Sequence, residues 1–488
     1  AALALKAGMD QELPDYACYR TGLPEALKRG LIAMDDIDAA VGRVLVEKSR
    51  LGLFESPYVD IDGITLNTKE HRSVATEAAT KSIVLLKNDG TLPLNNEGTV
   101  ALIGPLADDQ LAVFCGYSFP VHLIMAFRLS GADGKYAKTL KEAFEDRIAK
   151  DRMLHARGCD VLTERPMDAP VFPSDENTST GRQESFLSFD TSRIDDAVAT
   201  ALEAETVVVA LGDLAGLFMT GTVGEGSDAT SLELPGVQQQ LLERLLDTGK
   251  PVVVVLMNGR PYNLGVGFEK AAAVIEAFLP GQEGADAIVD VLYGDANPGG
   301  RLPVSIPKTA GAMPYFYNHK MKSGGFPIQP DFGAVFPFGF GLSYTTFEYD
   351  DFAVKDLEVP VDGTIEVECS VRNTGQVSGD EVVQLYVRDC NASLVRPVRE
   401  LKGFKRITLD SGAAARVTFA LPVDMLGFTV EGVDRIVEPG EVDLVIDTSC
   451  TGLMIPALDA YLVNALELRA DVARMPLTEV GCAAGAVA

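Results

Sequence analysis

The sequence predicts an α/β protein in which a mostly parallel sheet, covered by helices on both faces, is followed by a small β-sandwich. Continuous β-branched runs occur at 206–212 and 251–259, and helical patterns occur at 194–205 and 235–249. Strands that are apolar throughout and alternate with helices are typical of parallel sheets that are buried on both faces. After residue 345 the pattern changes to short, partly alternating strands, which indicates a separate β-domain.

The N-terminal part predicts helices, and the chain opens inside one of them. Residues 24–50 carry Val41 and Leu45 at helical spacing. Asp35 and Asp36 precede them, where negative charge complements the dipole of a helix N-terminus. Proline and turn-forming residues then predict a linker.

The α/β region begins with a predicted helix at 71–82 that leads to apolar strands at 83–87 and 100–104. A further apolar run follows at 272–281. Residues 163–187 are rich in Ser, Pro, Asp and Thr and carry no period, so we expect a long surface loop there.

The β-sandwich is predicted from strands at 364–373, 380–389, 415–422 and 440–447, within roughly a hundred residues. The last forty or so residues change again, to a helical pattern at 456–468 and then a stretch of Cys, Gly and Ala.

Composition excludes several classes of function. The chain has 488 residues and a net charge of −28, and such a field repels nucleic acid and anionic membrane surfaces. The apolar runs are shorter than the roughly 20 residues that cross a bilayer. The N-terminus carries no secretory signal, and localisation stays open because an upstream signal would be missing.

Metal and disulfide chemistry are not indicated either. The seven cysteines are odd in number and form no CxxC pair, and the four histidines are dispersed, so we expect no metal site. There is no tryptophan. Sugar sites commonly stack a sugar face on an aromatic ring, so a complete sugar enzyme without tryptophan would be unusual.

Several stretches together carry a family resemblance. In chain order they include AGMDQELP (7–14), SIVLLKNDGTLPL (82–94), GEGSDATSLELPG (224–236), TGKPVVVVLMNGRP (248–261) and NTGQVSGDEVVQLYVRD (373–389). This series, which runs through most of the chain, resembles glycoside hydrolase family 3, the β-glucosidase and β-xylosidase family. The resemblance implies hydrolysis of terminal β-linked glucose or xylose, with an oligosaccharide or an aryl or alkyl β-glycoside as substrate and no metal or organic cofactor.

The resemblance also implies a domain order. Residues 1–60 are similar to the end of a (β/α)8-type barrel with a linker, residues 61–345 to the family's α/β sandwich, and residues 350–446 to its fibronectin type III-like domain. The barrel motif whose Asp is the family's nucleophile does not occur in the sequence. We therefore expect little or no turnover from this chain alone. Apolar residues on the N-terminal helices, left without a barrel, suggest association, including a homo-oligomer.

Glu225 is the candidate catalytic residue. Retaining glycosidases hold two carboxyl groups about 5–5.5 Å apart, one as nucleophile and one as acid/base. The resemblance implies that Glu225 is the acid/base, and flanking Gly224 and Gly226 would let its loop approach a sugar. The alternative is one more solvated Glu on an acidic surface. Asp228 would bind a sugar hydroxyl or merely cap a turn, and Ala229 stands where many relatives have Arg.

Three further residues have structural alternatives. Tyr117, in GYSFP, would line the sugar site, although core packing is the commoner fate of an isolated aromatic. Arg260 and Arg301 are expected to be turn and interdomain scaffold.

A second functional hypothesis for the whole chain is a non-catalytic module that binds carbohydrate or a partner chain.

Residues 447–488 resemble a fragment of a type III polyketide synthase, a thiolase-fold enzyme. By that resemblance Cys482 is the acyl-accepting nucleophile; otherwise it is a buried Cys in a small-residue stretch. A thiol nucleophile needs a His to activate it, and no His follows His319. Acyl transfer through Cys482 is therefore the weakest of the three functional hypotheses.

Overall fold

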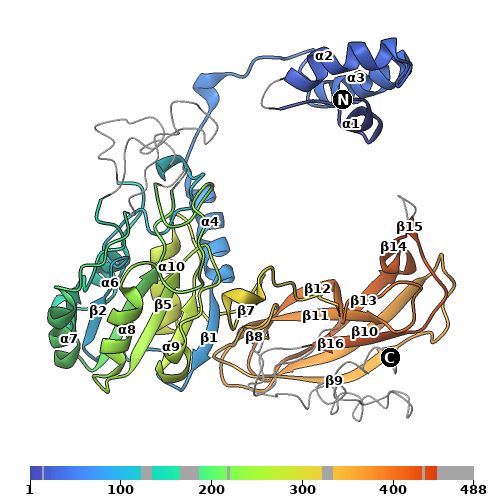
Figure 1. Ribbon diagram of the computed structural model, residues 1–488. Helices are drawn as coiled ribbons and strands as arrows, with labels where there is room; N and C mark the ends of the chain where they lie inside the picture. The colour runs from blue at the N-terminus through green and yellow to red at the C-terminus, as the bar shows by residue number, and fades with distance from the viewer. Residues whose placement is uncertain are drawn as a thin grey trace. The chain divides into compact units, whose positions relative to one another are not determined.

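The chain consists of two compact units, residues 1–69 and 70–488 (Figure 1). A computed structural model describes residues 1–13, 16–121, 135–164, 186–216, 220–320, 333–430 and 435–447.

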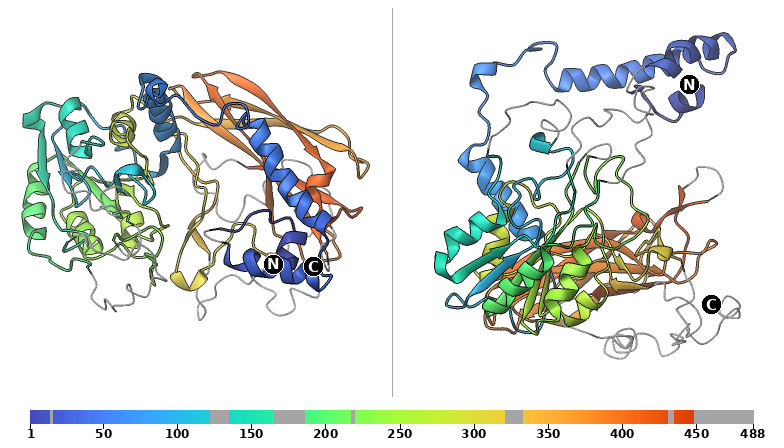
Figure 2. Two further views of the ribbon diagram at one scale, coloured as in Figure 1. Left: turned by 90° about the horizontal axis from the view of Figure 1, so that it is seen from above. Right: turned by 60° about the vertical axis from the view of Figure 1, so that its left-hand side comes forward.

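The first unit is helical. It contains α1 (Ala2–Lys6), α2 (Ala17–Lys28) and α3 (Met34–Arg50), and α1 packs against both of the others. Figure 2 shows α3 as one continuous helix. As predicted, two acidic residues lie in its first turn, and the Asp36 carboxylate accepts a hydrogen bond from the Ala33 amide at 2.8 Å. The short helix η1 (Ile61–Gly63) lies in the predicted linker.

The core of this unit is small, and many apolar side chains stay exposed on its surface. Among the described residues of this unit, four apolar ones are buried: Leu5, Ala26, Ile32 and Ala40. Val41 and Leu45 of α3, which follow the predicted helical spacing, are both exposed.

The second unit begins with a mixed sheet whose core is parallel. In the described part its spatial order is β1 (Val84–Asn88), β6 (Ala273–Glu276), β5 (Val252–Met257), β4 (Thr206–Gly212), β2 (Val100–Ile103) and β3 (Met153–Ala156). Every neighbouring pair is parallel except β1 and β6, so β1 is an antiparallel edge strand. The predicted α/β class with a mostly parallel sheet is confirmed.

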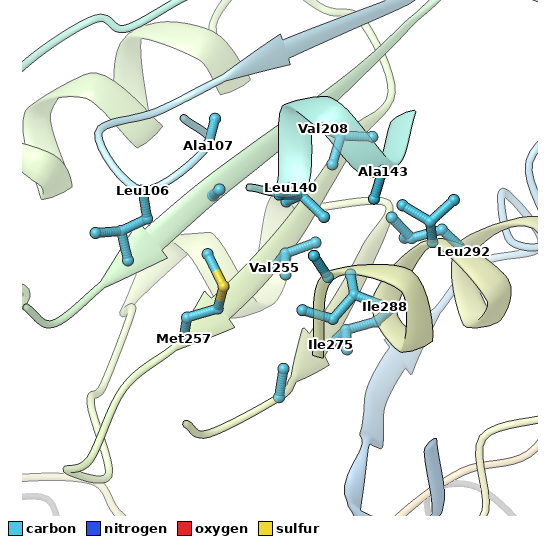
Figure 3. Packing of buried hydrophobic residues seen from close by; sticks show 14 of the residues in the cluster. Leu106, Ala107, Leu140, Ala143, Val208, Val255, Met257, Ile275, Ile288 and Leu292 are labelled. Atoms are coloured by element: carbon cyan, nitrogen blue, oxygen red, sulfur yellow. The ribbon is translucent and has the colours of Figure 1, made fainter. Parts of the chain in front are cut away.

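Helices cover both faces of the sheet (Figure 1). One face packs against α4 (Lys69–Ser82), α6 (Leu140–Arg147) and α10 (Gly284–Tyr293), and the other against α7 (Ile194–Glu203), α8 (Gln238–Leu246) and α9 (Val266–Lys270). Neighbouring strand residues point to opposite faces, so Val208 joins the first layer and Val209 the second. Figure 3 shows Val208, Val255 and Ile275 packed with Leu140 of α6 and Ile288 of α10.

The β-sandwich follows. One sheet has the order β13 (Ala414–Pro422), β10 (Thr364–Asn373), β9 (Phe347–Val354), and the other β12 (Glu400–Leu409), β11 (Gly379–Asp389), β16 (Val442–Asp447). Residues of β10 alternate between buried and exposed, as a strand with one face on a core must. The predicted C-terminal β-domain is therefore present.

Short elements complete the described chain. They are η2 (Lys150–Arg152), β7 (Ile306–Pro307), η4 (Ala310–Ala312), β8 (Ala334–Phe336), η5 (Val423–Leu426), β14 (Phe428–Thr429) and β15 (Arg435–Ile436). Among the residues that the structure describes, every helix is too short or too polar to span a membrane.

Three of the predictions concern residues that the structure does not describe, or describes only in part. Most of the predicted loop at 163–187, the predicted helix at 456–468 and Cys482 lie outside the described residues.

Candidate active site

The order of the strands indicates where a ligand would bind to the parallel sheet. The chain leaves β2 for β3 on one side and then returns past β2 to form β4 on its other side. In open α/β sheets, ligands bind beyond the carboxyl ends of the strands where the order reverses in this way. Tyr117 follows β2 and Glu225 follows β4, so both predicted residues belong to loops at this point of the sheet.

The two residues are in contact. The Tyr117 hydroxyl donates a hydrogen bond to Oε2 of Glu225. Tyr117 is 63% exposed and Glu225 is also exposed, so the pair is open to solvent. The hydrogen bond to the carboxylate raises the pKa of Tyr117 above its ordinary value, because ionising the phenol would remove the donated proton. Asp228 is exposed three residues beyond Glu225.

The loop that carries Glu225 folds back on itself. The Gly216 amide donates to the Val223 carbonyl at 2.9 Å, and the Thr222 amide donates to the Leu214 carbonyl at 2.8 Å. Gly224 has a φ of +125°, and a Cβ there would lie 1.8 Å from the Gly216 carbonyl oxygen. This close approach, within the loop itself, is a structural reason for the glycine besides the approach of a sugar that the sequence suggested.

A fully buried carboxylate anchors the start of this loop. Asp213, directly after β4, is 0% exposed. Its oxygens accept hydrogen bonds from Thr222 Oγ1 at 2.7 Å, from the Tyr262 hydroxyl at 2.6 Å and from the Gly259 amide at 3.0 Å. These donors satisfy a buried charge that would otherwise be very costly, and they tie the loop to the segment after β5. Burial, together with Asp213, raises the pKa of Tyr262.

A second buried acid, Glu276, stands at the end of β6. It accepts hydrogen bonds from the Phe278 amide at 3.0 Å and from Asn258 Nδ2 at 3.3 Å. Burial in an apolar environment raises the pKa of Glu276 to about 8, and the nearby charge of Asp213 acts in the same direction. The sequence reasoning missed both acids, although each stands in or directly after an apolar strand run, which is a usable signal.

One of the predicted scaffold residues, Arg301, lies apart from this pair. Arg301 forms an ion pair at 3.1 Å with Glu381 of β11, and therefore joins the α/β domain to the β-sandwich as its scaffold role predicts. Across the residues that the structure describes, His, Cys, Asp and Glu side chains form no group of three or more that could hold a metal ion.

Family models match two parts of the chain. Residues 83–344 match the glycosyl hydrolase family 3 C-terminal domain, and residues 381–450 match the fibronectin type III-like domain. Both matches end before Cys482, and the resemblance of residues 447–488 to a polyketide synthase finds no support in these comparisons.

Curated relatives and solved structures agree with the models. The chain is 34% identical to the periplasmic β-glucosidase of Salmonella typhimurium and 35% identical to a β-xylosidase of Formosa agariphila, over 91% and 92% of its length. It covers only 58% and 59% of those two proteins. A solved β-glucosidase involved in saponin metabolism from intestinal bacteria aligns with a TM-score of 0.77 and 32% identity, over 92% of this chain and 62% of that one.

A second solved structure, the β-glucosidase of Listeria innocua in complex with isofagomine, aligns with a TM-score of 0.72 and 27% identity, over 92% of this chain and 58% of that one. The family 3 model alone spans more than half of the 488 residues. The chain belongs to glycosyl hydrolase family 3.

Proposed function

We propose that this chain supplies the general acid/base carboxylate, Glu225, for retaining hydrolysis of terminal β-D-glucosides or β-D-xylosides. The observation that carries the proposal is the placement of Glu225: it is exposed, it accepts a hydrogen bond from Tyr117, and its loop follows the strand at which the sheet order reverses. An acid/base must reach the glycosidic oxygen, so exposure on an anchored loop suits the role.

The substrate class rests on the relatives. Two of them are named a β-glucosidase and a β-xylosidase, which favours a terminal β-linked sugar as the group that is cleaved. Tyr117 would contact the sugar next to the scissile bond, and Asp228 would accept a hydrogen bond from a sugar hydroxyl. Neither role needs a metal ion.

The acid/base works with a second carboxylate. In the first step Glu225 protonates the leaving oxygen while the second carboxylate attacks the anomeric carbon, and in the second step Glu225 deprotonates the attacking water. We assign this nucleophile to a (β/α)8-type barrel, of which residues 1–60 would be the last helices.

The test is the effect of Glu225→Gln on hydrolysis of 4-nitrophenyl β-D-glucoside and β-D-xyloside. Loss of general acid/base assistance lowers the rate by about 10²–10⁴-fold. The effect is expected to be largest for alkyl glycosides, whose leaving groups need protonation, and smallest for 2,4-dinitrophenyl glycosides. Where the chain alone turns over too slowly, the same variants are compared after co-expression with the part of the Salmonella typhimurium enzyme that this chain does not cover.

Glu233→Gln is the matched control, because Glu233 is an exposed acid shortly after the same loop. It is expected to leave the rate unchanged. Ordinary turnover that survives Glu225→Gln with every leaving group would contradict the proposal.

A further inference from the structure

Arg260, which the sequence suggested was only part of a turn, contacts both ends of the segment that carries Glu225. Its Nη1 donates to the Thr222 carbonyl at 2.7 Å, and its Nη2 donates to the Ser227 carbonyl at 2.5 Å. Glu225 lies between these two anchor points. One rigid guanidinium therefore fixes the backbone on each side of the proposed acid/base.

The guanidinium is itself held in place by buried groups. Its side chain is 16% exposed, and its Nη1 also donates to the Tyr262 hydroxyl at 3.1 Å. That hydroxyl donates in turn to Asp213, whose carboxylate lies 3.9 Å from Arg260 and balances its charge. Since Arg presents five donors in a planar fork, it can hold two carbonyls at once, which the single ammonium of Lys cannot do with the same geometry.

We propose that Arg260, neutralised by buried Asp213, is the positioning residue that holds Glu225 against Tyr117 for proton transfer. The proposal rests on the proposed function of Glu225, but it adds a residue with no contact to the substrate. By holding the backbone of an exposed loop, Arg260 restricts the motion of the Glu225 carboxylate.

The contact between Tyr117 and Glu225 provides a readout that needs no catalysis. In chain labelled with ¹³C-tyrosine, the Tyr117 signal is assigned with Tyr117→Phe and its pKa is read from a pH titration. The wild type is expected to titrate above the ordinary value of about 10. Glu225→Gln should bring the pKa of Tyr117 back toward that value and so calibrate the loss of the contact.

We expect Arg260→Met to lower the pKa of Tyr117, as Glu225→Gln does. Arg301→Met is the matched control, since it removes another largely buried Arg of the same unit whose ion pair lies elsewhere. It is expected to lower stability and leave the Tyr117 titration unchanged. Arg260→Lys, which keeps the charge and one carbonyl contact, should give an intermediate titration and carries the test if Arg260→Met does not fold.

The kinetic arm separates this proposal from the proposed function. Where hydrolysis is measured, Arg260→Met should lower kcat by about 100-fold with KM little changed, as expected for a misplaced catalytic group. A Tyr117 pKa that stays at the wild-type value in both Arg260 variants overturns the positioning role, whatever the rates. A shifted Tyr117 pKa in the Arg260 variants, together with hydrolysis rates that do not depend on Glu225, would support the positioning role of Arg260 and overturn the proposed function of Glu225.

Discussion

At the scale of single residues, buried acids shape the candidate site. Asp213 and Glu276 are both almost completely inaccessible, yet their surroundings differ. The Asp213 carboxylate accepts hydrogen bonds from three donors and has a cation, Arg260, nearby. Glu276 has two donors and no cation among its described hydrogen-bond partners, and its pKa is raised to about 8. The neutral form of Glu276 is therefore the one that the fold accommodates.

The raised pKa of Glu276 predicts a pH dependence of stability. Between its unfolded pKa of about 4.5 and its folded pKa of about 8, the unfolded chain releases a proton that the folded chain keeps. The free energy of unfolding therefore falls as pH rises through this window, by at most about 1.4 kcal/mol per pH unit from this group. Glu276→Gln should flatten that slope, measured by urea denaturation from about pH 5 to about pH 8.

The control for this experiment is Glu233→Gln, which changes an exposed acid and should keep the wild-type slope. Equal slopes in the Glu276 variant and the wild type would show that Glu276 is already ionised in the folded protein.

The residues of the site differ in how far sequence alone predicts them. Glu225 was found because its Gly/Glu-rich stretch resembles a family motif, and its contact with Tyr117 joins positions 108 residues apart. Arg260 could not be recognised, because its function depends on reaching the carbonyls of Thr222 and Ser227, and local sequence carries no record of backbone contacts across loops.

At the scale of elements, the predictable ones are those with a clear pattern. The strand predicted at 206–212 coincides with β4, and that at 364–373 with β10, because one is apolar throughout and the other alternates. The sequence reasoning missed α10, since nearly all of its residues are buried and it shows little polar contrast. It also missed β3, a short edge strand with only partly buried residues, and β12, whose residues are mostly exposed or half-buried.

The close packing of Gly224 in the loop after β4 predicts the effect of adding a single methyl group at this position. Gly224→Ala would push a Cβ against the Gly216 carbonyl, so the turn must open and Glu225 must move. We expect a stability loss of about 1–3 kcal/mol and a fall in kcat of about 100-fold. Thermal denaturation and the rate with 4-nitrophenyl β-D-glucoside measure the two effects.

Gly249→Ala is the control, because Gly249 also has a positive φ (+72°) but nothing lies within 4 Å of the added Cβ. It should cost stability through backbone strain and leave the rate unchanged. An equal loss of rate in both variants would mean that the conformation of the Glu225 loop does not control catalysis.

At the scale of the whole molecule, a buried ion pair links two domains of the second unit. The side chain of Arg301 is 6% exposed, and that of Glu381, on β11 of the β-sandwich, is 0% exposed. Outside this buried pair, Arg406 of β12 also donates to the Lys81 carbonyl in α4 at 3.1 Å. The β-sandwich is therefore linked to the α/β domain by an ion pair and by a hydrogen bond from a charged side chain. We expect the two domains to unfold together.

Arg301→Met removes the cation beside buried Glu381 and should cost about 3–5 kcal/mol. Calorimetry is expected to show the single transition of the wild type separating into two. Arg416→Met is the comparison, because its ion pair with Glu368 is exposed to solvent and should contribute little to stability. A single transition in Arg301→Met, with a midpoint equal to that of Arg416→Met, would show that the buried pair does not couple the domains.

The most direct measurement for the role of Glu225 is azide rescue of Glu225→Ala with 2,4-dinitrophenyl β-D-glucoside, with the chain co-expressed with the part of the Salmonella typhimurium enzyme that it does not cover, so that a nucleophile is supplied. This leaving group departs without an acid, so the glycosyl intermediate still forms, and its slow hydrolysis should be bypassed by azide entering the space of the missing carboxylate. We predict an azide-dependent increase in rate and a β-glucosyl azide product. No acceleration by azide, or glucose as the only product, would contradict the assignment of Glu225 as the acid/base.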